Sequence, residues 1–150
     1  MQAQPQREHD WLRQMVGEWK VESEENDWSE SIRAVGDVWI LAEGRGANPD
    51  GSQASSIMTL GFDPVKNRFV GTWIGSMMHN LWLYEGELDD AGRVLTLHSE
   101  GPRFDDSGET TSYRDIIELD EDGNRIFRAE VLERDGSWKE MMRTLFRRLA

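Results

Sequence analysis

Short runs of alternating apolar and polar residues, each ended by turn residues, follow one another along almost the whole chain. In the first run, residues 17–24, Trp19 and Val21 point to one side while Glu18 and Lys20 point to the other. A period of two is typical of β-strands with one buried face. The later runs lie at about residues 29–36, 38–46, 54–62, 67–77, 80–88, 93–101, 110–120, 124–133 and 137–147. The sequence therefore predicts a meander of about ten strands.

The links between these runs are short and contain typical turn residues, as in Asp89-Asp-Ala-Gly92 and Asp122-Gly-Asn124. No helical pattern separates the runs, so neighbouring strands are expected to pair antiparallel. A strongly twisted sheet of this many strands either splits or closes, and only closure removes both of its edges. We predict a closed antiparallel up-and-down β-barrel.

A different pattern occupies the beginning of the chain. Residues 9–16 place Trp11, Leu12, Met15 and Val16 at helical spacing, with Asp10 as an N-cap. We expect one short amphipathic helix there, after a flexible N-terminus at residues 1–8. A length of 150 residues suits one domain, so residues 9–150 are expected to form a single barrel domain.

Composition restricts the partners and the location. Seventeen basic and 29 acidic residues give a formal charge of −12, which repels nucleic acids and anionic membranes. The chain has no cysteine, which suits a reducing compartment and removes thiolate nucleophiles and thiolate metal sites. There is no apolar run long enough for a membrane span and no signal-peptide core at the N-terminus. We expect a cytoplasmic protein with neither nucleic-acid nor membrane partners.

The most aromatic segment is residues 71–87, which is expected to form a hairpin. If the chain reverses at Met78-His79, Trp73 pairs with Tyr84. The residues that then share one face are Phe69, Trp73, Met77, Trp82, Tyr84 and Leu88, with Gly71, Gly75 and Gly86 between them. Such glycines leave room either for tight aromatic packing or for a ligand. We interpret this hairpin as an inner wall of the barrel.

The same reasoning assigns inner faces to other strands. The inward residues would be Leu95, Leu97 and Ser99, then Phe127, Ala129 and Val131, then Trp138, Met142, Thr144 and Phe146. The strand at 110–120 allows two choices, with either Asp115 or Arg114 facing inward. Both choices put a charge inside the barrel, where it needs a partner or water.

Several segments resemble a known family. They are Met15-Val-Gly-Glu-Trp-Lys-Val21, Gly61-Phe-Asp-Pro-Val-Lys-Asn-Arg-Phe-Val-Gly-Thr-Trp-Ile-Gly-Ser-Met-Met78, Leu81-Trp-Leu-Tyr-Glu-Gly86, Leu95-Thr-Leu97 and Tyr113-Arg-Asp-Ile-Ile-Glu118. Over about residues 9–148 the chain resembles the bacterial family DUF1579, a domain of unknown function. This resemblance implies a lipocalin-like (calycin) barrel and carries over no reaction or catalytic residue. Related barrels that hold haem use a late histidine, and no histidine follows His98, so haem is not expected.

Candidate site residues follow from the predicted interior. The ligand-binding candidates are Trp19, Phe69, Trp73, Met77, Trp82, Tyr84, Ser99, Arg114, Phe127 and Trp138. The weaker catalytic candidates are Asp115, Glu140 and His79, with Glu43 also considered, because a carboxyl among aromatic side chains can act as a general acid or base. The three histidines have no spacing suited to a metal, so neither a metal nor a cofactor is expected.

Three functions remain open on this basis. The first is binding of a small apolar or aromatic molecule inside the barrel. The second is an enzyme that uses a buried carboxylate, Asp115 or Glu140, with His79 or Tyr84. The third is an interaction module or homodimer with a packed interior, which exposed aromatic residues such as Trp28 or Trp39 with Phe104 would favour.

Overall fold

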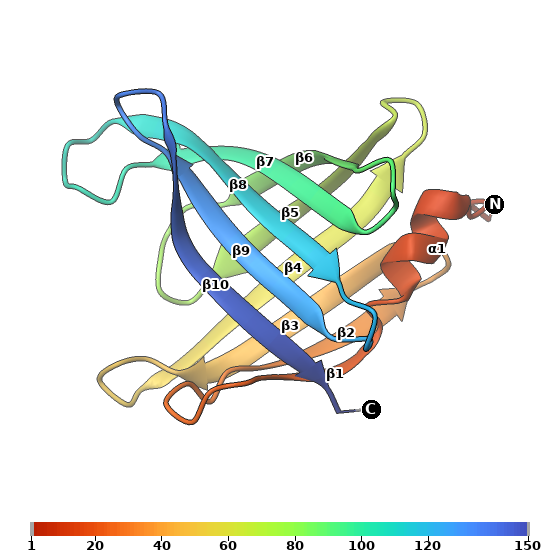
Figure 1. Cartoon of the computed structure of the whole chain (residues 1–150), viewed down its shortest axis with the longest axis horizontal. Helices are drawn as coiled ribbons and strands as arrows, with labels where there is room; N and C mark the ends of the chain where they lie inside the picture. Colours follow the sequence, from red (N-terminus) through yellow and green to blue (C-terminus); the bar gives the residue numbers. More distant parts are fainter. Residues whose placement is uncertain (1, 150) are drawn as a thin grey trace.

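Each strand of the protein pairs with its neighbours in the chain, and the first strand also pairs with the last. The computed structural model describes residues 2–149 and shows a closed barrel of ten antiparallel strands with one short helix (Figure 1). The elements are α1 (Arg7–Arg13), β1 (Gly17–Val21), β2 (Ser29–Val35), β3 (Trp39–Ala47), β4 (Gln53–Asp63), β5 (Arg68–Gly75), β6 (Trp82–Leu88), β7 (Val94–Pro102), β8 (Thr110–Leu119), β9 (Arg125–Leu132) and β10 (Trp138–Arg148). The predicted fold class and strand order are confirmed. Met1 and Ala150, which end the two predicted segments, lie outside the described residues.

The turns use the residues that the sequence indicated. In the β6–β7 turn, Gly92 has a φ of 70°, a conformation that glycine adopts without steric cost. Its backbone N–H donates to the carbonyl of Asp89 at 3.0 Å, and the Asp89 carboxylate accepts from the N–H of Arg93 at 2.8 Å. These bonds reverse the chain tightly enough for β6 and β7 to pair.

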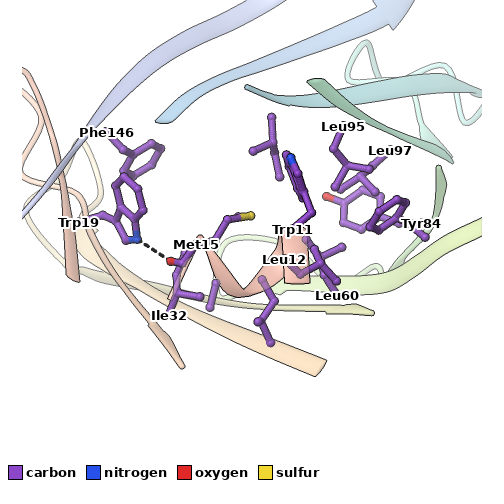
Figure 2. Packing of buried hydrophobic residues seen from close by; sticks show 14 of the residues in the cluster. Trp11, Leu12, Met15, Trp19, Ile32, Leu60, Tyr84, Leu95, Leu97 and Phe146 are labelled. Atoms are coloured by element: carbon purple, nitrogen blue, oxygen red, sulfur yellow. Dashed lines mark hydrogen bonds between the residues drawn. The ribbon is translucent and has the colours of Figure 1, made fainter. Parts of the chain in front are cut away.

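The helix closes one end of the barrel. In α1 and the turn after it, Trp11, Leu12 and Met15 are all buried, and they pack against the inner side chains of several strands (Figure 2). The Trp11 indole donates to the carbonyl of Gly92 at 2.8 Å, and the Trp19 indole donates to that of Met15 at 2.9 Å. Both polar indole groups are thus satisfied within an apolar core.

The helix begins earlier than the sequence suggested. Its N-cap is Gln6, so the prediction of Asp10 as the cap is wrong. The backbone N–H of Gln6 donates to Nδ1 of His9 at 2.8 Å, while the other nitrogen of this buried ring contacts the Phe62 carbonyl at 2.9 Å. His9 therefore helps to start the helix and to fix it to β4.

The β5–β6 hairpin keeps its predicted inner face but not its predicted register. Trp73 pairs with Trp82 and Gly71 pairs with Tyr84, a shift of two positions from the expected pairs. The connection is a loop of residues 76–81 in place of a two-residue turn, because Met78-His79 does not favour the positive φ values that such a turn needs. An even shift leaves every side chain on the same face.

Strand β10 contains an irregularity that changes its inner face. Glu140 pairs with Glu130, but Met142 pairs with Ala129, so Met141 is an extra residue. A β-bulge of this kind reverses the alternation beyond it. Thr144 and Phe146 line the interior as predicted, whereas Trp138, before the bulge, lies outside. The prediction that Trp138 points inward is therefore wrong.

The two choices for β8 are resolved. Tyr113, Asp115 and Ile117 face the interior, and Tyr113 and Ile117 are buried. Arg114 faces outward, where its guanidinium lies 3.8 Å from the ring centre of Trp138 and 2.7 Å from Glu130. The strand thus brings a carboxylate, not a guanidinium, into the barrel.

Candidate functional site

A cavity of about 380 Å³ occupies the half of the barrel that α1 leaves free. In an up-and-down barrel, loops after odd-numbered strands lie opposite the end where β1 begins, and α1 adjoins that beginning (Figure 1). The mouth is lined by residues from the loops after β1, β5 and β7, among them Trp28, Met77 and Phe104. The larger apolar side chains of the wall are Met58, Trp73, Trp82, Phe127, Met142 and Phe146.

The polar centre of the cavity is a pair formed by Asp115 of β8 and Tyr84 of β6. The tyrosine O–H donates to Oδ2 of Asp115 at 2.5 Å. Tyr84 is buried, whereas Asp115 keeps some accessible area because it borders the cavity. Since the barrel walls exclude water from most of the carboxylate, burial raises the pKa of Asp115 to about 6, although the bond from Tyr84 acts in the opposite direction.

The tyrosine of this pair responds to the same surroundings. Burial first, and then the neighbouring carboxylate, raises the pKa of Tyr84 well above its usual value. Tyr84 therefore stays a hydrogen-bond donor at any ordinary pH. The pair can accept or release one proton near neutrality, and Asp115 is the group that does so.

A second polar pair also lines the cavity. Arg125 of β9 is buried and donates to Oε1 of Glu30 on β2 at 2.6 Å. Its guanidinium carbon lies 4.1 Å from the ring centre of Phe146 and 4.9 Å from that of Trp19. Glu30 and the two aromatic faces thus compensate the buried positive charge.

These two pairs leave one charge unmatched. The charged residues that line the cavity are Glu30, Asp115 and Arg125, and Glu30 and Arg125 neutralise each other. Within residues 2–149, no basic side chain comes within ion-pair distance of Asp115. At neutral pH the interior therefore carries a carboxylate whose only direct partner among the described residues is the phenol of Tyr84.

The structure brings most of the predicted ligand-binding residues to this cavity, though not all of them. Those that line it are Trp73, Met77, Trp82, Tyr84, Ser99 and Phe127. Trp19 and Phe69 lie in the packed core near α1, and Arg114 and Trp138 lie outside the barrel.

The structure places one catalytic candidate inside the barrel and three on the surface. Asp115 lies inside, next to Tyr84. Glu140 is exposed and pairs with Arg143 at 2.9 Å, so its predicted interior position is wrong. The cause is the β-bulge at Met141, which also places Trp138 outside. His79 lies exposed in the β5–β6 loop, and Glu43 is exposed on β3. Asp115 is the one of the four that lines the cavity.

Many of the lining residues were not among the candidates, and three of these show why. Arg125 shares the alternation of Phe127 and Ala129, so counting back one more position would have found it. Glu30 could not be paired with Arg125 from the sequence, because 95 positions separate them. Trp28 lies over Gly44 and Gly46 of β3, where an added Cβ would overlap its ring.

The outer surface does not gather the aromatic residues that the third hypothesis named. Trp39 and Phe104 are exposed, but Trp39 begins β3 near the α1 end and Phe104 belongs to the mouth. Instead, exposed aliphatic side chains lie on the outside of β4, β5 and β6, where Ile57 pairs with Ile74. The homodimer stays a prediction.

Two features are absent from residues 2–149. No group of three or more His, Asp or Glu side chains there is arranged to hold a metal ion. The described part of the chain also contains no helix that is both long and apolar enough to cross a membrane.

Together, the meander, the terminal helix and the lined interior define a closed ten-stranded antiparallel barrel with a cavity inside it. Comparison with protein families gives a match over residues 4–148 to the family described as "Protein of unknown function (DUF1579)". The chain belongs to this DUF1579 family, as the resemblance in its motifs indicated. A search of curated proteins finds no match.

Proposed function

We propose that the protein binds one small apolar or aromatic molecule inside the barrel. The observation that carries this proposal is the cavity of about 380 Å³, which has mostly apolar walls. Ligand pockets typically have volumes of about 300–1,000 Å³ and combine apolar walls with a few polar groups. Asp115, Tyr84, Ser99 and Arg125 supply such groups here.

The side chains of the cavity walls can adapt to the shape of a ligand. Four methionines line the cavity, namely Met58, Met78, Met141 and Met142, in addition to Met77 at its mouth. Methionine is unbranched and polarisable, so it adapts to irregular surfaces at little cost. Trp73 and Trp82 add flat faces on which an aromatic ring can stack.

Titration with naphthylmethanol, a neutral aromatic alcohol, tests the binding proposal. We expect saturable quenching of tryptophan fluorescence with one site per chain, because Trp28, Trp73 and Trp82 line the cavity. Trp73→Ala should weaken binding several-fold. Trp39→Ala, which removes an indole from the outer surface, is the matched control and should leave the affinity unchanged.

Two results would overturn the binding proposal. One is the absence of saturable binding up to the solubility limit of the probe. The other is an equal loss of affinity in Trp39→Ala and Trp73→Ala, since that would place the probe elsewhere. Native mass spectrometry of the purified protein adds a direct search for a bound small molecule.

A second candidate function is acid–base catalysis by Asp115, which the absence of a nearby basic side chain favours. A carboxyl with a pKa of about 6 is largely ionised at neutral pH, yet it is a stronger base than an ordinary aspartate. Tyr84 would then hold the carboxylate in position through its bond to Oδ2. The reaction class would be proton transfer to or from a small apolar substrate.

Ring opening of nitrobenzisoxazole, a reaction that needs only a base, tests whether Asp115 can remove a proton from a bound molecule. We expect a rate that rises with pH around a midpoint near 6 and is lost in Asp115→Asn. Glu140→Gln, which removes an exposed carboxylate, should retain the full rate. If Asp115→Asn retains it as well, acid–base catalysis is rejected.

A further inference from the structure

We infer that the cavity is built for an organic cation, an apolar amine whose ammonium group pairs with the free oxygen of Asp115. This inference rests on the proposed binding function and names the chemical class of the ligand. It follows from the unmatched charge, from the open side of the carboxylate and from the aromatic side chains beside it.

The two carboxylate oxygens of Asp115 differ in their partners. Oδ2 accepts the bond from Tyr84, whereas Oδ1 accepts none from any residue in the described part of the chain. Oδ1 is not fully enclosed by protein atoms, so part of its surface borders the cavity. A buried carboxylate is costly unless its charge is matched. An ammonium group at Oδ1 would supply both the missing hydrogen bond and the missing charge.

Aromatic residues line the cavity together with the carboxylate. Tyr113 precedes Asp115 by two positions on the same face of β8, and its ring lies 5.0 Å from that of Trp82 at an interplanar angle of 88°. Phe104 adds a third ring 6.0 Å from Tyr113 and 6.4 Å from Trp82. Aromatic faces attract cations and also contact apolar groups. They therefore suit an amine with an apolar body.

The charges of the cavity disfavour the competing ligand classes. An anion would find Arg125 already engaged by Glu30 at 2.6 Å and would be repelled by Asp115. A neutral molecule could donate a hydrogen bond to Oδ1 but would leave the charge unmatched. The formal charge of −12 adds a field that attracts cations to the molecule.

The pH dependence of binding separates these classes. The titratable groups that face or adjoin Asp115 are Tyr84 on β6, Tyr113 on β8, Glu30 on β2 and Arg125 on β9. Burial raises the pKa of Asp115 itself to about 6. A cation needs the ionised carboxylate, so its affinity falls as the pH drops below this value. An acidic ligand shows the opposite trend, because protonation of Asp115 removes the repulsion.

Isothermal titration calorimetry with three naphthalene probes tests the inference. The probes are naphthylmethylamine, naphthylmethanol and naphthoic acid, which share the ring system and differ in charge. At pH 8 we expect the amine to bind about tenfold more tightly than the alcohol, since a charge-assisted hydrogen bond replaces a neutral one. At pH 5 the amine should bind about tenfold more weakly than at pH 8, because only about a tenth of Asp115 is ionised in the free protein.

Two variants complete the test. Asp115→Asn should weaken amine binding at pH 8 about tenfold and change alcohol binding by less than about twofold. Asp90→Asn, which removes an exposed carboxylate from the β6–β7 turn at the α1 end, should change neither. Circular dichroism confirms that both variants are folded.

Each remaining outcome decides between the two proposals. Equal affinity for amine and alcohol at pH 8 would overturn the cation inference and leave the binding proposal intact. Tightest binding of naphthoic acid, with an affinity that rises as the pH falls, would assign an acidic ligand instead. If none of the three probes binds, both proposals fail.

Discussion

The two ends of this barrel are built from the same strands but are filled in different ways. At the α1 end, the side chains of the helix and of every adjoining strand interlock, and Leu12, Met15, Trp19 and Leu60 are almost completely inaccessible (Figure 2). At the mouth, Met77 and Phe104 are about half or more exposed and border an unfilled space. The packed end supplies stability, which allows the open end to hold a buried charge and a cavity, both of which cost stability.

Glycines serve different purposes at the two ends. An added Cβ at Gly71 or Gly86 would overlap a backbone carbonyl, that of Thr59 or Thr96. These two glycines let the strands approach closely, which is the tight-packing alternative considered for this hairpin. An added Cβ at Gly75 would instead meet the side chains of Trp73 and Met77, next to the cavity.

The largest expected contrast comes from removing one indole at each end. Trp19→Ala should lower the free energy of unfolding by about 3–5 kcal/mol, because it deletes a fully buried ring and leaves the Met15 carbonyl without its donor. Trp73→Ala, in the cavity wall, should cost only about 1–2 kcal/mol, because its ring is already partly accessible. Urea denaturation measures both values. Equal losses would mean that the cavity wall is packed as tightly as the core.

The glycines give the next contrast. Gly71→Ala should destabilise the protein by about 2–3 kcal/mol, since the backbone of Thr59 cannot move without disturbing β4. Gly75→Ala should cost about 1 kcal/mol or less, because the added Cβ meets only side chains, the partly accessible Trp73 ring and the half-exposed Met77, which can shift toward the cavity. Thermal denaturation of the two variants side by side is sufficient. A milder effect at Gly71 than at Gly75 would contradict the assignment of the two glycines.

Removal of the buried carboxylate should increase the stability, whereas the substitutions above decrease it. The pKa of Asp115 is about 6 in the folded protein against its ordinary value of 3.8, so the folded state binds the proton more tightly and stability falls as the pH rises between these values. Asp115→Asn should therefore stabilise the protein at pH 7 by about 1–3 kcal/mol and have a much smaller effect at pH 4. Denaturation at both pH values measures this difference. A variant that is less stable at pH 7 would show that the carboxylate is matched by a partner.

Removal of the Tyr84 hydroxyl should have the smallest effect of these changes. Tyr84→Phe removes the hydrogen bond that opposes the effect of burial, so the pKa of Asp115 should rise further above about 6. Carbon NMR of the Asp115 carboxyl group follows this titration directly. An unchanged midpoint would mean that Tyr84 does not influence the charge of Asp115.

Most of the barrel follows from local patterns. Alternation and turn residues locate all ten strands to within three residues at their ends, because a half-buried strand must place its apolar residues on one side. Residues such as Leu97 and Tyr84 could therefore be assigned to the interior. The candidate site was less accessible, since two of its features depend on contacts that local patterns do not encode. The bulge at Met141 reverses the alternation of β10, and the pair of Arg125 and Glu30 joins strands that are far apart in the chain.

The closure of the barrel by β1 and β10 also determines when the protein can complete its folding. Trp19 pairs with Arg148, and the guanidinium of Arg148 donates to the carbonyl of Val16, a residue 132 positions earlier. Contacts between such distant positions form slowly, because a long loop of chain must first be ordered. During synthesis, one edge of β1 stays unpaired until β10 has left the ribosome. We therefore expect a slow final folding phase in which the formation of the β1–β10 seam and the burial of Trp19 occur together.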